Sequence, residues 1–308
     1  ELADAGVLHH RARICMNWAP DSPAGPTTEV LENRAQYHRE RVTPECVKLF
    51  LDGVPRESHT AGMLEPYVDT REGRDDEAGR YGMLLIEQDI TNELVTRFDL
   101  EGLTVKFHAA GDAAVRAGLD AIEAARTRNG DSGLRHNVGH VTFIAEEDVA
   151  RAKDLSATLE LSPYLWSPSP INDDITKAIG RERIDRVWPF REVIDAGGVV
   201  VAGSDWYVVP SVNPWIAIES LVMRENPGGS EKSFGKRQII SVEEAIDLFT
   251  VNAAEHMNKA DSLGRLQPGF LADLVVIDQN PYTVSATNLH RIRVLMTFIN
   301  GEKVFDGM

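Results

Sequence analysis

The sequence predicts an α/β fold built on a parallel β-sheet, because short apolar strands alternate with segments of helical periodicity. The expected strands span residues 13–18, 46–51, 104–108, 136–141, 157–162 and 199–204. The expected helices between them span residues 112–126, 146–152 and 190–195. Six strands fit a doubly wound sheet, and they fit equally a barrel of eight strands that lacks two.

The pattern changes after residue 262, where short antiparallel strands are expected. Residues 272–278 and 294–299 are predicted strands, and Asn300-Gly301 is a typical hairpin turn into a third strand at 303–305. We therefore expect a small separate β layer at the end of the chain. The predicted domains are residues 1–262 and 263–308.

Three segments lack clear periodicity and are rich in Gly, Pro, Ser or charged residues: 52–81, 162–174 and 225–235. Loops of this length inside a compact domain are usually functional or mobile. The first two follow predicted strands, on the side where α/β folds place their sites. After the third, a capping box at Ser241 to Glu244 predicts a helix that continues through Phe249.

The composition limits the classes of partner. The 308 residues carry a formal net charge of −16, with 48 acidic against 32 basic residues. Nucleic acids and anionic membrane surfaces need clustered positive charge, so neither is expected as a partner. No apolar run approaches the roughly 20 residues of a membrane span. The two cysteines, Cys15 and Cys46, are too few for a disulfide framework, so we expect reduced thiols and a cytoplasmic protein.

The strongest candidates for catalytic or metal-binding residues stand at the ends of four different strands. Lys48, His108, His140 and Asp205 occupy these positions. In a parallel sheet, residues at the carboxyl ends of the strands converge on one pocket. Imidazole and carboxylate groups are the donors that hold zinc or another divalent metal. Each residue alone has a structural explanation, but four together favour a metal-dependent hydrolase.

Other polar residues are weaker candidates. His136 lies four residues before His140, on the same face of the strand but about 13 Å deeper, so it is not expected to share a metal. His9, His10 and His59 are interpreted as solvated. Asp112 is expected to start a helix, and it could also orient His108.

Two further groups of side chains have alternative explanations. The loop residues Tyr67, Tyr164 and Trp166 either shape an apolar part of the pocket or pack its rim. Arg181, Arg183 and Arg186 either bind a substrate anion or form a solvated face, which is the preferred interpretation.

Several stretches resemble the amidohydrolase superfamily, specifically its amidohydrolase-3 group, which includes N-substituted formamide deformylases and proteins called exoenzyme regulatory proteins. The matching segments include VKLFLDG, HAAGDAAVRAGLDAIEAAR, GHVTFI, AGGVVVAGSDW and LGRLQPGFLADLVVIDQNP, in the family's order. The resemblance implies a (β/α)8 TIM-type barrel with strands three to eight present and the first strands missing. It also implies that the C-terminal strands are part of a composite β-sandwich.

The resemblance also implies roles for single residues. His108 and His140 match metal ligands on the fifth and sixth strands, and Asp205 matches the aspartate on the eighth. Lys48 matches the fourth-strand position, where a lysine carboxylated by CO2 bridges two metals. The implied cofactor is one or two divalent ions, with zinc as the first expectation.

Two departures from the family pattern matter. No His-x-His, the first-strand ligand pair, is present in residues 1–45, and Gly139 replaces the usual Glu before the sixth-strand His. The missing pair suggests a chain cut at its N-terminus, which we expect to be inactive alone.

The implied reaction is hydrolysis of an amide or formamide-like C–N bond by a metal-activated water, with Asp205 and His140 as the catalytic residues. The expected partner is a small-molecule amide substrate, and self-association into a homo-oligomer is left open. The alternative is a non-catalytic or regulatory protein that acts through a small-molecule ligand.

Overall fold

The structure is a computed structural model that describes residues 1–19, 28–69, 76–165, 167–209 and 211–307. Its strands are β1 (Ala12–Asn17), β2 (Val42–Phe50), β3 (Thr104–Ala109), β4 (Asn137–His140), β5 (Thr158–Leu161), β6 (Val199–Ala202), β7 (Leu274–Ile277), β8 (Val294–Ile299) and β9 (Glu302–Asp306). The α-helices are α1 (Thr28–Glu32), α2 (Glu77–Tyr81), α3 (Gln88–Leu100), α4 (Asp112–Asn129), α5 (Glu146–Asp154), α6 (Pro170–Ile179), α7 (Arg181–Ile184), α8 (Phe190–Asp195), α9 (Pro214–Met223), α10 (Val242–Phe249) and α11 (Val251–His256). Short 3-10 helices lie at Arg34–Tyr37, Pro163–Leu165, Lys236–Gln238 and Ala286–Arg291.

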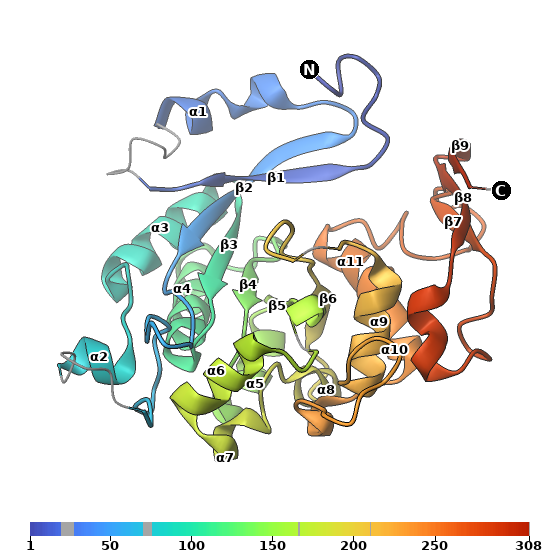
Figure 1. The fold of residues 1–308 in the computed structure, drawn as a ribbon. Coiled ribbons are helices and arrows are strands. Elements are labelled where there is room, and N and C mark those ends of the chain that lie inside the picture. The colour runs from blue at the N-terminus through green and yellow to red at the C-terminus, as the bar shows by residue number, and fades with distance from the viewer. Residues whose placement is uncertain (20–27, 70–75, 166, 210, 308) are drawn as a thin grey trace.

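The first six strands form one parallel sheet in chain order, from β1 to β6 (Figure 1). This confirms the predicted α/β class and the six predicted strands, although β2 begins at Val42 rather than residue 46. Among the described residues, β1 and β6 are the two edges of the sheet, so these strands alone do not close a barrel. The arrangement fits part of a TIM-type fold.

Helices cover the outer face of this sheet. Helices α3 and α4 pack on β3, α5 packs on β5, and α8, α10 and α11 pack on β6 (Figure 1). The strand residues beneath them, among them Val47, Phe107, Leu159 and Val200, have no exposed surface. Burial of alternate strand residues under helices leaves the others, including Lys48 and His108, on the opposite face.

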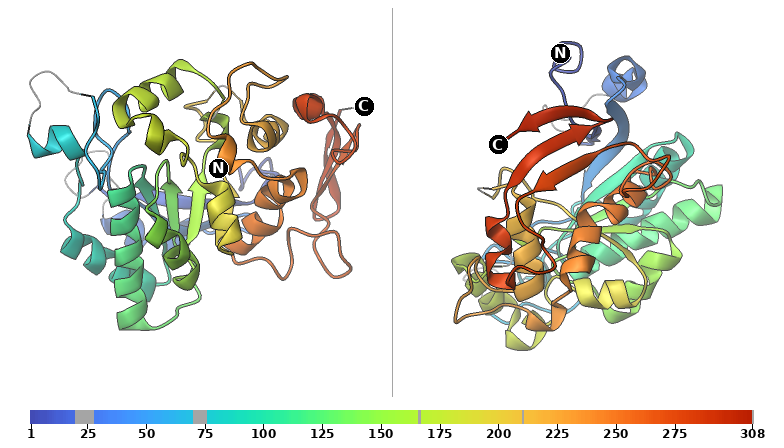
Figure 2. Two further views of the ribbon diagram at one scale, coloured as in Figure 1. Left: turned by 90° about the horizontal axis from the view of Figure 1, so that it is seen from below. Right: turned by 90° about the vertical axis from the view of Figure 1, so that its right-hand side faces the viewer.

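The last three strands form a separate antiparallel sheet in the order β7-β8-β9 (Figure 2). Its hairpin turn is the predicted Asn300-Gly301, and both residues have a positive φ, of 53° and 79°. This is the backbone that a two-residue hairpin of this kind requires, and Asn and Gly adopt it most readily. The side chain of Arg11 donates hydrogen bonds to Asp273 and Asn300, which connects this sheet to the start of the chain.

The capping box expected before α10 is present. The Ser241 hydroxyl accepts a hydrogen bond from the Glu244 amide (3.1 Å), and the Glu244 carboxylate accepts one from the Ser241 amide (2.8 Å). By contrast, the segment 162–174 is not wholly irregular, because α6 begins at Pro170. Proline is well suited to the first turn of a helix, where its missing N–H would have no partner.

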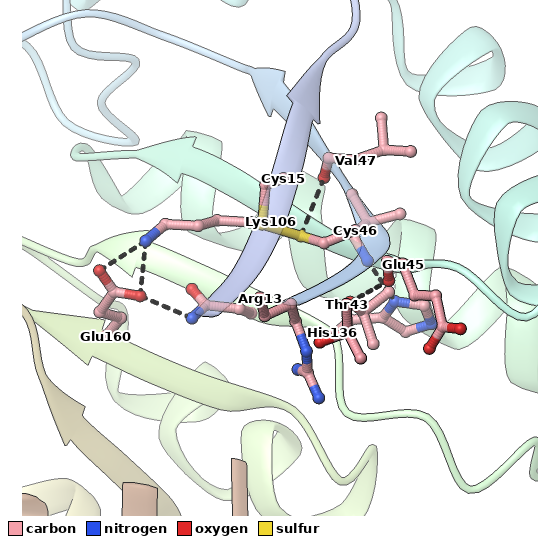
Figure 3. The surroundings of a disulfide bond; sticks show 12 residues. Arg13, Cys15, Thr43, Glu45, Cys46, Val47, Lys106, His136 and Glu160 are labelled. Atoms are coloured by element: carbon pink, nitrogen blue, oxygen red, sulfur yellow. Dashed lines mark hydrogen bonds and ion pairs between the residues drawn. A yellow bond between two sulfur atoms is a disulfide. The ribbon is translucent and has the colours of Figure 1, made fainter. Parts of the chain in front are cut away.

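The expectation of two reduced cysteines is wrong. Cys15 on β1 and Cys46 on β2 lie directly opposite each other in the sheet register and form a disulfide (Figure 3). They are 31 residues apart in sequence, and only the pairing of the two strands brings them together. Disulfides persist mainly in oxidising compartments, so the premise of the cytoplasmic prediction does not hold. In the described part of the chain, no helix is long and apolar enough to cross a membrane.

Reduction of this disulfide is expected to destabilise the protein. A cross-link between residues 31 positions apart restricts the unfolded chain, and loops of that size correspond to about 3–4 kcal/mol. Urea unfolding with and without a thiol reductant measures the difference. The double variant Cys15→Ser/Cys46→Ser should match the reduced protein and be insensitive to reductant. An equally stable reduced protein would contradict the prediction.

Candidate functional site

Two histidines meet at the carboxyl ends of neighbouring strands. His108 lies near the end of β3 and His140 is the last residue of β4. Their ring centroids are 4.6 Å apart, with the rings edge to face. The ring of Phe50, the last residue of β2, stacks on His108 at 5.3 Å. The structure therefore places the two predicted histidines side by side.

The hydrogen bond of His108 determines its tautomer. Its Nε2 lies 2.9 Å from the carbonyl oxygen of Gly53, and a carbonyl only accepts hydrogen bonds, so Nε2 carries the hydrogen. In the neutral ring, Nδ1 then holds the lone pair. Burial lowers the pKa of His108, and the charge of Lys48 lowers it further against the opposing Gly53 hydrogen bond. The neutral imidazole is thus the favoured form.

His140 is also favoured in its neutral form. Burial lowers its pKa, and the neighbouring His108 and Lys48 act in the same direction. Glu160 opposes them but does not outweigh them. A neutral imidazole with an available lone pair is the form that binds metal ions.

Asp205 follows the end of β6 by three residues and has a left-handed backbone, with φ of 55°. Its charge raises the pKa of both Lys48 and His108, which places the carboxylate in their electrostatic neighbourhood. The next three residues, Trp206, Tyr207 and Val208, are 68%, 83% and 72% exposed. Asp205 is therefore flanked by an apolar surface that the sequence did not indicate.

Lys48 is the fourth predicted residue. Burial lowers the pKa of its amine to about 8, and the adjacent Lys106 contributes to the shift. Its Nζ lies 5.1 Å from the centre of the Phe50 ring. Lys48 also lowers the pKa of His108 and His140, whereas Asp205 acts on Lys48 and His108.

Proximity does not amount to a complete set of metal ligands. Among the residues that the structure describes, no three His, Cys, Asp or Glu side chains are close enough together to hold a metal ion. The structure pairs His108 with His140 and leaves Asp205 in their vicinity. The ligand set therefore stays a prediction.

A half-buried ion pair that the sequence did not indicate lies on the same face of the sheet as Lys48. Lys106 donates to both carboxylate oxygens of Glu160, at 2.6 and 2.7 Å (Figure 3). Asn137 donates to the same carboxylate at 2.7 Å. Burial opposes the ionisation of Glu160, but Lys106 and Asn137 outweigh it, so its pKa is lowered. The sequence signal for this ion pair was a charged residue within each of two otherwise apolar strands, Lys106 in β3 and Glu160 in β5.

Glycine leaves room for this carboxylate. A Cβ atom on Gly203 would lie 2.5 Å from Glu160 Oε1, and one on Gly139 would lie 3.4 Å from the Glu160 Cβ. Gly139, where the family pattern has Glu, therefore lies against the backbone and Cβ of Glu160 on β5.

The other predicted histidines have different outcomes. His136 is fully buried, accepts a hydrogen bond from the Val105 amide and bonds to Asp99 at 3.0 Å, so it is structural, as expected. His9 and His10 are exposed, as expected. His59 is not solvated: it is buried, pairs with Asp69 at 2.7 Å and stacks on Tyr67.

Asp112 does begin a helix, but its carboxylate accepts from the Leu64 amide (2.8 Å) rather than contacting His108. The loop aromatics have structural contacts. The Tyr67 hydroxyl donates to the Ala61 carbonyl, and the Tyr164 hydroxyl donates to the Val212 carbonyl. Trp166 lies outside the described residues.

Only one of the three arginines fits the solvated-face interpretation, because Arg183 and Arg186 are half-buried and bonded to other parts of the protein. Arg181 is exposed. Arg183 donates to the Pro66 carbonyl at 2.8 Å, and Arg186 pairs with Glu192 at 2.6 Å.

The profile of the amidohydrolase family matches residues 5–305, nearly the whole chain. The chain belongs to the amidohydrolase family. This membership confirms the resemblance on which the residue roles were predicted.

Two curated relatives of this amidohydrolase-family chain are informative. It is 28% identical over 264 residues to the protein YtcJ of Bacillus subtilis, covering 85% of this chain and 47% of that protein. It is 27% identical over 212 residues to the N-substituted formamide deformylase of Arthrobacter pascens, covering 68% of this chain and 38% of that enzyme. The chain thus spans less than half the length of these relatives.

A solved structure shares the fold. A metal-dependent hydrolase of uncharacterised function from Pyrococcus horikoshii superimposes with a TM-score of 0.73 at 24% identity, over 92% of this chain and 54% of that one. At this identity the likeness supports the fold alone.

The buried histidines of this amidohydrolase-family chain predict a loss of stability in acid. Burial lowers the pKa of four of them, His108, His136, His140 and His256. Unfolding restores a pKa of about 6.5, so below that pH the unfolded chain binds more protons, and up to about 1.4 kcal/mol per pH unit is lost for each histidine. Urea unfolding between about pH 8 and pH 5 measures the slope. The control His9→Gln should keep the same slope, and stability that rises on acidification would contradict the prediction.

The Lys106–Glu160 pair predicts a second outcome. Lys106→Met leaves a partly buried carboxylate without its cation, which is expected to cost about 3 kcal/mol of stability. The double variant Lys106→Met/Glu160→Gln should recover most of that loss. The exposed pair of Lys303 and Asp306 supplies a control, because Lys303→Met should cost less than about 1 kcal/mol. Equal losses for the two single variants in urea unfolding would refute a special role for the half-buried pair of Lys106 and Glu160.

Proposed function

We propose that the protein is a metal-dependent hydrolase that cleaves an amide or formamide-like C–N bond with water. One observation carries the proposal: His108 and His140, both favoured as neutral rings, lie side by side at the carboxyl ends of β3 and β4. Asp205, at the end of β6, supplies a carboxylate to the same neighbourhood.

The donor chemistry of these residues fits a divalent ion, with zinc as the first choice. His108 presents Nδ1, because Nε2 is engaged by the Gly53 carbonyl. Two imidazoles and a carboxylate are a common zinc donor set. A bound divalent ion would lower the pKa of a water toward neutrality and polarise the substrate carbonyl.

The protein's own groups supply the proton transfers. We assign to Asp205 the acceptance of a proton from the attacking water and its delivery to the leaving amine. His140 holds the ion or orients the substrate carbonyl. The products are an acid and an amine, and formate is the acid when the substrate is a formamide.

Lys48 is proposed as a further ligand, carboxylated on Nζ. Its position at the end of β2, next to Lys106 and within the electrostatic reach of both histidines, supports this. Carboxylation would replace a cation with an anion beside the ion. It would also add oxygen donors to a set that the described residues do not complete.

The substrate class is proposed from the relatives. One of them is an N-substituted formamide deformylase. The exposed apolar run from Trp206 to Val208, directly after Asp205, is suited to an apolar N-substituent. A small-molecule amide is therefore the proposed substrate, with neither nucleic acid nor membrane as a partner, consistent with the net charge of −16.

The test combines metal content with turnover. This chain, and the product of the whole reading frame that contains it, are loaded with zinc, dialysed and assayed for bound metal and for amine release from N-substituted formamides. We expect stoichiometric zinc and turnover in at least one of these two proteins. His108→Ala or His140→Ala should lower turnover about 100-fold or more, because loss of a group that only orients a metal ligand already costs about 10–100-fold. His9→Ala is the matched control.

If neither of the two proteins binds metal and neither releases amine, the proposal is rejected. That result would support the alternative, a non-catalytic protein that acts through a small-molecule ligand.

A further inference from the structure

Asp52, the second residue after β2, is a buried carboxylate that the proposed reaction does not use. Its side chain is 1% exposed. One oxygen accepts a hydrogen bond from the Ala110 amide at 2.9 Å. The other accepts from the Gly111 amide at 2.8 Å and from the Gly62 amide at 3.0 Å. A single carboxylate thus satisfies three backbone donors.

These three donors come from two segments, one 10 residues from Asp52 in the sequence and the other 58 to 59 residues away. Ala110 and Gly111 form the turn between β3 and α4, and Gly62 belongs to the loop after β2. The two segments approach so closely that a Cβ on Gly111 would overlap the carbonyl group of Gly62. Asp52 therefore fixes the end of β3, the start of α4 and the loop as one unit.

The same unit contacts His108. The residue after Asp52 is Gly53, whose carbonyl accepts the hydrogen bond from His108 Nε2 at 2.9 Å. Asp52 Oδ1 itself lies 3.8 Å from that nitrogen. The Gly53 carbonyl is the hydrogen-bond acceptor, and the Asp52 carboxylate, beyond hydrogen-bond distance, places negative charge on the same side of the ring; both favour a hydrogen on Nε2 and a lone pair on Nδ1.

Asp112, the residue expected to orient His108, is engaged elsewhere. Its carboxylate accepts from the Leu64 and Ala113 amides. Of the acidic side chains that the structure describes, only Asp52 has a carboxylate oxygen within 4.0 Å of a nitrogen of the His108 ring. The orienting role thus falls to Asp52.

We infer that Asp52 is a positioning residue for His108: it holds the Gly53 carbonyl and the β3–α4 turn in place, so that Nδ1 keeps its lone pair. This inference rests on the proposed function only where it assigns a metal to Nδ1. A purely structural carboxylate would stabilise the turn without controlling the tautomer of the ring.

The test is ¹⁵N NMR of protein labelled at histidine, with the His108 signals assigned by their loss in His108→Gln. In the unsubstituted chain we expect one neutral tautomer with the hydrogen on Nε2. Asp52→Asn keeps the size of the side chain but turns an N–H₂ group toward backbone donors, so a mixture of tautomers is expected. Asp120→Asn, at an exposed carboxylate paired with Arg151, is the control and should leave the His108 signals unchanged.

Zinc affinity, measured by calorimetry on the same samples, gives the second readout. Loss of an orienting partner typically weakens metal binding 10–100-fold, and that range is expected for Asp52→Asn. Asp120→Asn should bind as the unsubstituted chain does.

The inference is overturned if His108 in the unsubstituted chain carries its hydrogen on Nδ1 or exchanges between tautomers, a result that needs no variant to fold. It is overturned equally if folded Asp52→Asn keeps the single Nε2–H tautomer. If the tautomer responds as expected but no sample of this chain binds zinc, the positioning role stands and the assignment of a metal to Nδ1 in this chain fails.

Discussion

The parallel register of the six strands is the constraint on which the site depends. Each strand from β2 to β6 pairs in parallel with its neighbour in chain order, so the carboxyl ends of these strands all lie at the same end of the sheet. Residues far apart in the sequence are therefore neighbours in space: His108 reaches His140, and Lys106 reaches Glu160 across two strand intervals. The chemistry of the site follows from this register, because no local segment brings these side chains together.

Burial then determines the charge states of the side chains that the strand register brings together. The neutral form of the His108 and His140 rings is favoured, because burial and the nearby charge of Lys48 both lower their pKa. Glu160 stays ionised because Lys106 and Asn137 bond to it directly. One face of the sheet thus holds two neutral imidazoles beside an ion pair. A single charged group without a partner would be unfavourable there, because it would be removed from water without compensation.

Much of this was accessible from the sequence. The six strands, the hairpin at Asn300-Gly301 and the capping box at Ser241 were predicted because each depends on local periodicity or on one residue type in one conformation. The pairing of His108 with His140 was predicted because strand ends converge in parallel sheets. The sequence did not indicate contacts that depend on exact register. These include the disulfide of Cys15 and Cys46, the burial of His59 against Asp69, and the three amides gathered by Asp52.

The disulfide also limits how copies of this chain can associate. Strand β1 is an edge strand, paired only with β2 among the described residues, and edge strands are the elements that molecules most readily exchange. With Cys15 bonded to Cys46, β1 stays with its own chain, and an exchanged pair would have to be covalently joined. Any association between copies that leaves non-reducing gels monomeric therefore proceeds without exchange of β1 and its disulfide.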